Sequence, residues 1–463
     1  MTITFVNRES ELSFMEELWK RENAFLPVYG RRRVGKTRLI KEFIKDKPSL
    51  YYLARNSTYM DNLREFASVV LEKFPSPFLN PSSFSSFSDV FRYLAEKGKL
   101  IVVIDEFPYL IHSDKKVLSE FQYIVDEVVR NSRLHLILVG SSVGMMEEHV
   151  LSQKSPLYGR RDGQIKLDPL DFFNSWKLLG TDVEEALKIY GITGGIPAYL
   201  LLFRRFEDVK SVAFSKRGFL YAEADFLLSS ELREPRVYKL ILKAIAEGKT
   251  RFNEISTYTG IPRSNLFKYV EVLERLGFLR REIPVTAPPK TKHTRYRIAD
   301  SYMTFYFRFI EKYRNEIELE SLDFWEDFLG EYNHYLGSVF ERVAKQFLVE
   351  LNKAGKLPFK FTKIGRWWHK SEEIDIVALN ERERKALFVE VKWKDLSERE
   401  AKGILKDLEK KTELVGLEGW KHHYGLIAKN VERKEKLRED GFHVWDLEDF
   451  GSPHSPLSAL TNR

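Results

Sequence analysis

A strand-to-helix turn near the N-terminus carries residues whose types and spacing suit phosphate binding. Residues 30–37, GRRRVGKT, match the phosphate-loop pattern, with an apolar run before them and a helical stretch after them. In such a loop the glycines let backbone N–H groups turn toward phosphate oxygens, and the helix start adds partial positive charge. We expect Lys36 to reach the β- and γ-phosphates and the Thr37 hydroxyl to hold magnesium. The expected nucleotide contacts here are Gly30, Arg31, Arg32, Arg33, Val34, Gly35, Lys36, Thr37 and Arg38.

A second motif ends a strongly apolar run. Residues 100–106, LIVVIDE, read as a buried strand followed by acids at its carboxyl end, the edge where parallel sheets bind ligands. We expect Asp105 to fix magnesium through water and Glu106 to activate the attacking water as general base. The chain has no Asn-Lys-x-Asp element for reading guanine, so the sequence favours ATP over GTP.

Polar residues further along the chain have two interpretations each. Ser141 and Ser142 follow the apolar run 134–140, where they would sense the γ-phosphate or simply form a turn. Arg160 and Arg161 follow a glycine turn and would either stabilise the transferring phosphoryl group or belong to a solvated basic turn. An arginine that acts on a neighbouring subunit would require a homo-oligomer.

Hydrophobic periodicity indicates how these residues are positioned. Apolar runs at 24–30, 49–54, 100–105 and 134–140 alternate with helical stretches, a pattern typical of an α/β fold with a parallel sheet. The expected parts are a P-loop ATPase core over 1–175, a helical lid over 176–234, a winged helix-turn-helix over 235–300, a helical connector over 301–331 and a C-terminal α/β domain over 332–463.

The winged-helix prediction comes from one segment with three helical patterns. Helices are expected over 236–247, 251–258 and 263–276, and the wing strands over 278–285 and 295–298. The side chains suited to DNA are Arg263, Ser264, Asn265 and Lys268 in the third helix and Lys292 and Arg295 in the wing. The same helical pattern also serves as a protein-docking module, so the basic wing is what favours DNA.

The N-terminal two thirds resembles archaeal P-loop ATPases of the STAND-like branch of AAA-type folds. The matching segments, in order, are FVNRESEL, YGRRRVGKT, VVIDEFPYL, LVGSSVGMMEE, LYGRRDGQIKLDPL and YGITGGIPAYL. The resemblance implies that Asn7 and Arg8 lie near the adenine and that Arg160 is the finger arginine. It also implies that the segment containing Pro197 contributes a second sensing element.

The C-terminal region resembles the PD-(D/E)xK nuclease-like domain often fused to such ATPases. Asp375 lies in one expected strand, and Glu390 and Lys392 lie two residues apart on the next, so they share a face. Asp375 and Glu390 would bind magnesium while Lys392 activates water, with Glu341 on the preceding helix as a third carboxylate. The Pro that opens the named motif is absent, because Ile374 stands there. The alternative is a half-buried sheet on which acids and lysines merely pair.

Composition restricts the chemistry further. The 463 residues include no cysteine, which excludes disulfides, thiolate metal sites and cysteine nucleophiles. Lys and Arg number 75 against 68 acids, a mild excess of +7 that is compatible with a nucleic-acid or phosphate partner. No apolar stretch reaches the length of a signal peptide core or a membrane span, so a cytoplasmic protein is expected.

Together the motifs predict a magnesium-dependent ATPase that acts as a switch coupled to DNA-binding and nuclease-like domains. Two alternatives remain open at this level. One is a magnesium-dependent DNA endonuclease whose ATP site only regulates cutting. The other is a nucleotide-gated scaffold with neither turnover nor cleavage.

Overall fold

The computed structural model describes residues 6–232 and 234–451, and these divide into two compact units. The first unit contains the chain up to Pro169 together with Ile196–Ala198. The second contains Leu170–Gly195 and the chain from Tyr199 onward. Apart from Ile196–Ala198, the described residues of the expected lid, winged helix, connector and C-terminal domain therefore fall within the second unit.

The first unit is built around a five-stranded parallel sheet with strand order β2-β3-β4-β1-β5. The strands are β1 (Ala24–Tyr29), β2 (Ser49–Leu53), β3 (Leu100–Asp105), β4 (Leu134–Gly140) and β5 (Ile165–Lys166). Every residue of β1, β3 and β4 is buried, which explains why continuous apolar runs predicted them. This order brings the carboxyl ends of β1, β4 and β3 side by side.

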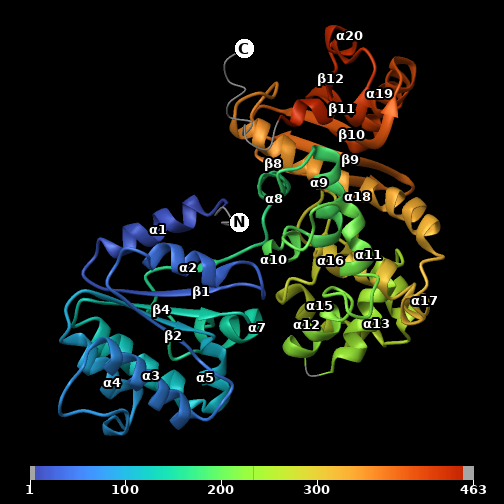
Figure 1. Cartoon of the computed structure of the whole chain (residues 1–463). Helices are drawn as coiled ribbons and strands as arrows, with labels where there is room; N and C mark the ends of the chain where they lie inside the picture. The colour runs from blue at the N-terminus through green and yellow to red at the C-terminus, as the bar shows by residue number, and fades with distance from the viewer. Residues whose placement is uncertain (1–5, 233, 452–463) are drawn as a thin grey trace. The chain divides into compact units, whose positions relative to one another are not determined.

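Helices cover both faces of this sheet (Figure 1). One face packs against α1 and α2 through a core that includes Met15, Leu39 and Phe43. The other face packs against α3 to α6 through a core rich in phenylalanine. The helices are α1 (Glu9–Trp19), α2 (Lys36–Ile44), α3 (Tyr59–Lys73), α4 (Phe87–Ala95), α5 (Phe107–Ser113), α6 (Lys116–Tyr123) with a π-helical continuation over Ile124–Val129, and α7 (Val143–Met146).

A proline in the strand that leads into the phosphate loop is tolerated for a local reason. Pro27 lacks an N–H and would interrupt a fully paired strand. On the side facing β5, Phe25 donates its N–H to Asp162 Oδ2 at 2.8 Å, and the short β5 pairs only with Val28 and Tyr29. Pro27 thus occupies the one stretch of that edge where no strand needs its donor.

The second unit opens with short helices and a winged helix. The helices are α8 (Phe172–Leu179), α9 (Val183–Thr193), α11 (Val209–Val212), α12 (Glu223–Glu231), α13 (Pro235–Ala246), α14 (Phe252–Thr259), α15 (Arg263–Arg275), α16 (Ser301–Phe305) and α17 (Arg314–Glu318), while α10 (Pro197–Leu200) begins in residues grouped with the first unit. The wing is the antiparallel pair β6 (Leu279–Glu282) and β7 (Arg295–Ile298). The three helices and β7 match the sequence expectation closely, whereas β6 is shorter than the expected 278–285.

A single long helix, α18 (Trp325–Lys353), runs from the expected connector into the C-terminal domain. The expected boundary at 332 therefore falls inside a continuous element. Aromatic side chains at its start, including Phe328 and Tyr332, pack with Phe305 and Phe309 in a cluster of rings. Because α18 also packs on the C-terminal strand β10 (Lys385–Leu396), it connects this ring cluster to the C-terminal sheet.

The C-terminal sheet is mixed, with order β12-β11-β10-β9-β8. Strands β8, β9 and β10 form an antiparallel meander. Strand β11 pairs in parallel with β10, and β12 pairs in parallel with β11. The elements are β8 (Lys363–His369), β9 (Glu372–Asn380), β10 (Lys385–Leu396), α19 (Glu398–Thr412), β11 (Lys421–Val431), α20 (Lys434–Glu439) and β12 (His443–Trp445). Both α18 and α19 pack on β10, so this strand is the centre of the domain.

Across the described ranges 6–232 and 234–451, we find no helix that is both long and apolar enough to cross a membrane.

Candidate functional site: a phosphate loop and a carboxylate pair

The loop between β1 and α2 has the backbone shape that phosphate binding needs. A Cβ on Gly30 would lie 2.4 Å from the carbonyl oxygen of Leu167, so only glycine fits at that position. Gly35 has a φ of +100°, a conformation that other residues rarely adopt, and it begins α2. Val34 is buried beneath the loop and anchors it to the core.

Lys36 lies inside this loop and is 6% exposed. Its Nζ donates to the carbonyl oxygens of Gly30 at 2.8 Å and Arg31 at 2.9 Å. The ammonium group is therefore held at the centre of the loop by backbone oxygens. A phosphate that enters the loop would meet this positive charge directly.

The β3 carboxylate meets the loop as the two motifs predicted. Thr37 donates its hydroxyl to Asp105 Oδ2 at 2.9 Å, and the Tyr51 hydroxyl donates to the same oxygen at 2.5 Å. Burial, followed by this hydrogen bond to Asp105, raises the pKa of Tyr51 well above its ordinary value, so Tyr51 remains a donor. Oxygen ligands of this kind are what magnesium prefers, so Thr37 and Asp105 fit the ion.

Glu106 lies at the carboxyl edge of the sheet in a left-handed backbone conformation, with φ of 54°. Its Oε2 accepts a hydrogen bond from the Ser141 hydroxyl at 2.7 Å and from the Ser141 N–H at 3.3 Å. Ser141 comes from the end of β4, which lies between β3 and β1 in the sheet. The interpretation of Ser141 as a simple turn residue is therefore incomplete, because it holds the acid expected to act as base.

The two candidate finger arginines are held by partners outside the loop. Arg160 Nε donates to both oxygens of Asp126 at 2.8 and 2.9 Å, and its Nη1 donates to the Pro156 carbonyl. Arg161 Nη1 donates to the Leu151 carbonyl at 3.4 Å. None of these interactions joins either arginine to a loop residue. An arginine that acts on a phosphate bound in the loop of the same unit would therefore have to leave these partners.

Three residues assigned by resemblance also have clear positions. Asn7 and Arg8 both have positive φ, and Arg8 donates to the Asp168 carbonyl while it pairs with Glu11. Pro197 begins α10 and is grouped with the first unit together with Ile196 and Ala198, whereas Gly195 and Tyr199 on either side belong to the second unit. Their contact with a nucleotide remains a prediction.

The winged helix presents most of its expected DNA-contacting residues to solvent. Arg263, Ser264, Asn265 and Lys268 are exposed along α15, as is Lys292 in the wing. Arg295 differs, because its Nη1 pairs with Glu373 at 2.7 Å and its guanidinium lies 4.6 Å from the Trp368 ring centre. Arg295 thus joins the wing to the C-terminal sheet, a role that the sequence did not indicate.

In the C-terminal sheet, three of the predicted residues meet. Lys392 Nζ lies 2.6 Å from Glu390 Oε2 and 3.4 Å from Asp375 Oδ2, and Val391 donates its N–H to the same Asp375 oxygen at 2.9 Å. Lys411 from α19 donates to the other Glu390 oxygen at 2.9 Å. The period-two prediction that Glu390 and Lys392 share a face therefore agrees with the observed contact.

Charge and burial make this pair of carboxylates unequal. Burial, followed by the nearby charge of Glu390, raises the pKa of Asp375. Burial acts the same way on Glu390, but Lys392 and Lys411 outweigh it and lower the pKa of Glu390. The same two carboxylates outweigh burial at Lys392 and raise its pKa. Lys392 is therefore a charged bridge between two buried acids.

The predicted third carboxylate lies elsewhere. Glu341 on α18 pairs with Arg366 on β8, and Arg366 also contacts Glu373 at 3.2 Å. No group of three or more acids and histidines in the described ranges is arranged to hold a metal ion. A magnesium site at Asp375 and Glu390 would thus form without Glu341 or would require Arg366 to release it.

The sequence did not predict two residues that bind these carboxylates, Lys411 at Glu390 and Arg366 at Glu341. Lys411 follows Lys410 in the last turn of an amphipathic helix, where a basic residue is ordinary, so the sequence carried no signal for it. Arg366 lies in β8 between the half-buried Gly365 and the buried Trp367, and an arginine at such a position can indicate a buried ion pair.

Three known sequence families match parts of the chain. Residues 5–203 match a family described as an ATPase domain predominantly from Archaea. Residues 240–282 match the IclR helix-turn-helix domain, and residues 306–404 match a family of archaeal and bacterial proteins of unknown function. The chain therefore has an archaeal P-loop ATPase domain, a helix-turn-helix domain and a C-terminal mixed-sheet domain.

Comparisons with individual proteins extend over more of the chain. The protein MJECL04 of Methanocaldococcus jannaschii is 44% identical over 454 residues, which is 96% of this chain and all of that protein. The ATP-binding protein MJ0423 of the same organism is 54% identical over 46 residues, 10% of this chain and 78% of its own. Among solved structures, the Walker-type ATPase paby2304 of Pyrococcus abyssi has a TM-score of 0.51 and 27% identity, covering 66% of this chain and 96% of its own.

Proposed function

The chain belongs to the same family as MJECL04 of Methanocaldococcus jannaschii, and we propose that it is a magnesium-dependent ATPase that works as a nucleotide-controlled switch on DNA. The observation that carries the proposal is the meeting of Lys36, Asp105 and Glu106 at one edge of the sheet. A binding loop alone would need neither the buried Asp105 nor a glutamate held beside it.

The arrangement suggests how the residues divide the work. Lys36 binds and neutralises the β- and γ-phosphates, while Thr37 and Asp105 would hold magnesium, which supplies further charge neutralisation at the phosphate oxygens. Glu106 takes the proton of the attacking water. Ser141 keeps the Glu106 carboxylate in place, so the base is oriented before the nucleotide arrives.

Replacing Lys36 with alanine is expected to weaken ATP binding by about ten- to a hundredfold, because charge-assisted hydrogen bonds to phosphate contribute about 1.5–3 kcal/mol. Isothermal titration calorimetry with ATP and magnesium measures this directly. Lys45→Ala, just beyond the end of α2, removes an exposed lysine and should bind as the wild type does. Equal ATP affinity in both variants would remove the basis of the proposal.

DNA is the proposed partner of the winged helix. The N-terminal half of α15 exposes Arg263, Ser264 and Asn265 while Leu266 and Val270 hold the helix in its core. A positive side chain with amide and hydroxyl neighbours at the start of such a helix suits contacts to base edges and phosphates. Lys268 and Lys292 add positive charge for the DNA backbone.

Replacing Arg263 with alanine should weaken DNA binding by about 1–3 kcal/mol and reduce its dependence on salt. Arg275→Ala, in the last turn of the same helix and also exposed, removes the same charge at the opposite end. Fluorescence anisotropy with duplex DNA at two salt concentrations compares the two variants. Equal losses would mean that DNA does not meet the start of α15, and would favour a protein-docking role.

A second function, magnesium-dependent DNA cleavage, is proposed for the C-terminal domain. It is supported by the order of elements, a helix followed by a three-stranded meander, a helix and a parallel strand, and by the contact of Asp375, Glu390 and Lys392. Two buried carboxylates beside a lysine suit magnesium binding and water activation. In this reading ATP turnover controls when the C-terminal domain cuts.

A further inference from the structure

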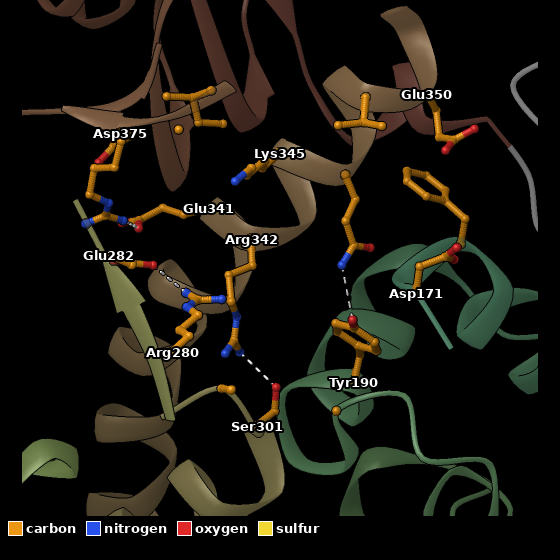
Figure 2. A pocket seen from close by; sticks show the side chains of 18 of the residues that line it. Asp171, Tyr190, Arg280, Glu282, Ser301, Glu341, Arg342, Lys345, Glu350 and Asp375 are labelled. Atoms are coloured by element: carbon orange, nitrogen blue, oxygen red, sulfur yellow. Dashed lines mark hydrogen bonds and ion pairs between the residues drawn. The ribbon is translucent and has the colours of Figure 1, made fainter. Parts of the chain in front are cut away.

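A pocket of about 530 Å³ lies within the second unit, away from the phosphate loop in sequence. Its walls come from α8 and α9, the wing strand β6, the middle of α18 and strands β8 and β9 (Figure 2). The volume is in the range of pockets that bind small molecules. Segments that are far apart in the chain thus meet around one cavity. Asp375 of the proposed cleavage site lies at its edge, but the cations that line the rest of the pocket take part in neither proposed function.

Basic side chains crowd one part of this pocket. Figure 2 shows Arg280 from the wing facing Arg342 and Lys345 from α18. Burial lowers the pKa of Arg280 from its ordinary value despite Glu282, and Arg342 acts in the same direction. Burial and then the charge of Arg280 lower the pKa of Lys345. These cations repel one another, and an anion among them would remove that repulsion.

Their hydrogen-bonding capacity is also incompletely used. Among the described residues, the buried Nε of Arg280 has no hydrogen-bond partner, although Nη2 of the same side chain pairs with Glu282 at 2.9 Å. The exposed Lys345 forms no hydrogen bond or ion pair within the same residues. Arg342 Nη2 donates to the Ser301 hydroxyl at 3.0 Å. A phosphate group offers several acceptor oxygens, which suits donors arranged in this way.

One acid of the pocket pairs with the cation cluster, and the others have partners elsewhere. Glu282 pairs with Arg280 at 2.9 Å as well as with Arg297 at 2.8 Å, and Glu341 pairs with Arg366. Asp171 caps α8 through the Asn174 N–H at 2.8 Å, Glu350 pairs with Lys353 at 2.7 Å, and Asp375 accepts from Val391. Among the described residues, none of these carboxylates forms an ion pair with Arg342 or Lys345, although the charge of Glu282 acts on Lys345.

Away from these cations, Figure 2 shows Tyr190 beside the acids Asp171 and Glu350. Phe173 also lines the pocket, and the Tyr190 hydroxyl accepts a hydrogen bond from Gln346 at 3.2 Å. Flat aromatic walls bind the faces of nucleobases, and their use tolerates different bases. A cavity with donors for phosphate in one part and rings in another has the two halves of a nucleotide site.

We propose that this pocket is a second nucleotide site, which binds the phosphate of a nucleoside monophosphate between Arg280, Arg342 and Lys345. The sugar and base then extend toward Tyr190 and Phe173. Two sources share this chemistry, a free nucleotide and the phosphorylated end of a DNA strand. The ligand binds where the wing, α18 and the C-terminal sheet meet. Its binding therefore links the presence of a nucleotide or a strand end to the C-terminal domain.

Binding is tested with the full chain carrying Lys36→Ala, so that the phosphate loop contributes little, and with EDTA present. Titration calorimetry with AMP measures affinity, and adenosine serves as the probe that lacks phosphate. Lys345→Ala should weaken AMP binding by about tenfold or more, through loss of a charge-assisted contact. Lys363→Ala on β8 removes an exposed lysine outside the pocket and should leave the affinity unchanged.

The two sources are separated by oligonucleotides that carry either a 5′-phosphate or a 5′-hydroxyl. Tighter binding of the phosphorylated strand, lost in Lys345→Ala, identifies strand ends as the ligand, whereas binding of AMP alone identifies a free nucleotide. Arg342→Gln gives a second variant from the same helix and should weaken the same probe. Equal binding of AMP and adenosine, no binding of any probe at millimolar concentration, or equal affinities in Lys345→Ala and Lys363→Ala would overturn the proposal.

Discussion

Replacing Glu106 with glutamine should leave ATP bound and lower turnover by about a hundred- to ten-thousandfold, the usual contribution of a general base. Glutamine keeps the size of the side chain and can still bond to Ser141, so the edge of the sheet is preserved. It cannot accept the proton of the attacking water. The expected result is therefore a fall in kcat with little change in ATP affinity.

The measurement is phosphate release under saturating ATP and magnesium, with ATP affinity from calorimetry on the same samples. Glu148→Gln is a matched control, because Glu148 is exposed and lies on the segment after β4. If wild type, Glu106→Gln and Glu148→Gln turn over equally slowly, the protein is a nucleotide-gated scaffold and the hydrolytic role of Glu106 is wrong.

Replacing Lys392 with methionine should abolish the proposed DNA cleavage and also destabilise the C-terminal domain. The substitution leaves the carboxylates of Asp375 and Glu390, whose side chains are 9% and 5% exposed, without the cation between them. Losing one partner of a fully buried pair costs about 3–5 kcal/mol. Lys392 is partly exposed and Lys411 remains on Glu390, so we expect about 1–3 kcal/mol.

Chemical denaturation measures the stability, and incubation of duplex DNA with magnesium measures cleavage. Lys394→Met removes an exposed lysine two residues along the same strand and should change neither quantity. Magnesium should restore part of the stability of Lys392→Met, because it replaces the missing positive charge between the acids. A stable Lys392→Met protein that cuts DNA as the wild type does would refute both the ion bridge and the catalytic assignment.

Most elements near the ATP site could be predicted because their determinants are local. Fully buried parallel strands require continuous apolar runs, and the loop and acid motifs follow directly at the ends of β1 and β3. Ser141 could be placed at the same edge for this reason, but its bond to Glu106 depends on the strand order. That order brings β4 between β3 and β1 and is not contained in any short segment.

The second unit was harder to predict because its important contacts join distant residues. Arg295 looked like a DNA-contacting residue from its place in a basic wing, yet Glu373, 78 residues later, binds it. Glu341 looked like a metal ligand, and Arg366 pairs with it. The pocket proposed to bind a nucleotide is lined by residues from segments that are far apart in the chain, and it has no sequence motif.

The contact between the wing and the C-terminal sheet fixes the distance between the proposed DNA-binding helix and the proposed cleavage site. Val285 donates its N–H to the Arg366 carbonyl at 2.9 Å and packs with Trp367 and Ile374, while Arg295 binds Glu373. The helix proposed to bind DNA and the carboxylates of the proposed cleavage site thus belong to one packed body, which holds them at a fixed separation. Cleavage by such a protein would fall at a constant number of base pairs from the bound sequence. Mapping the cut ends on a single DNA substrate would read that spacing directly.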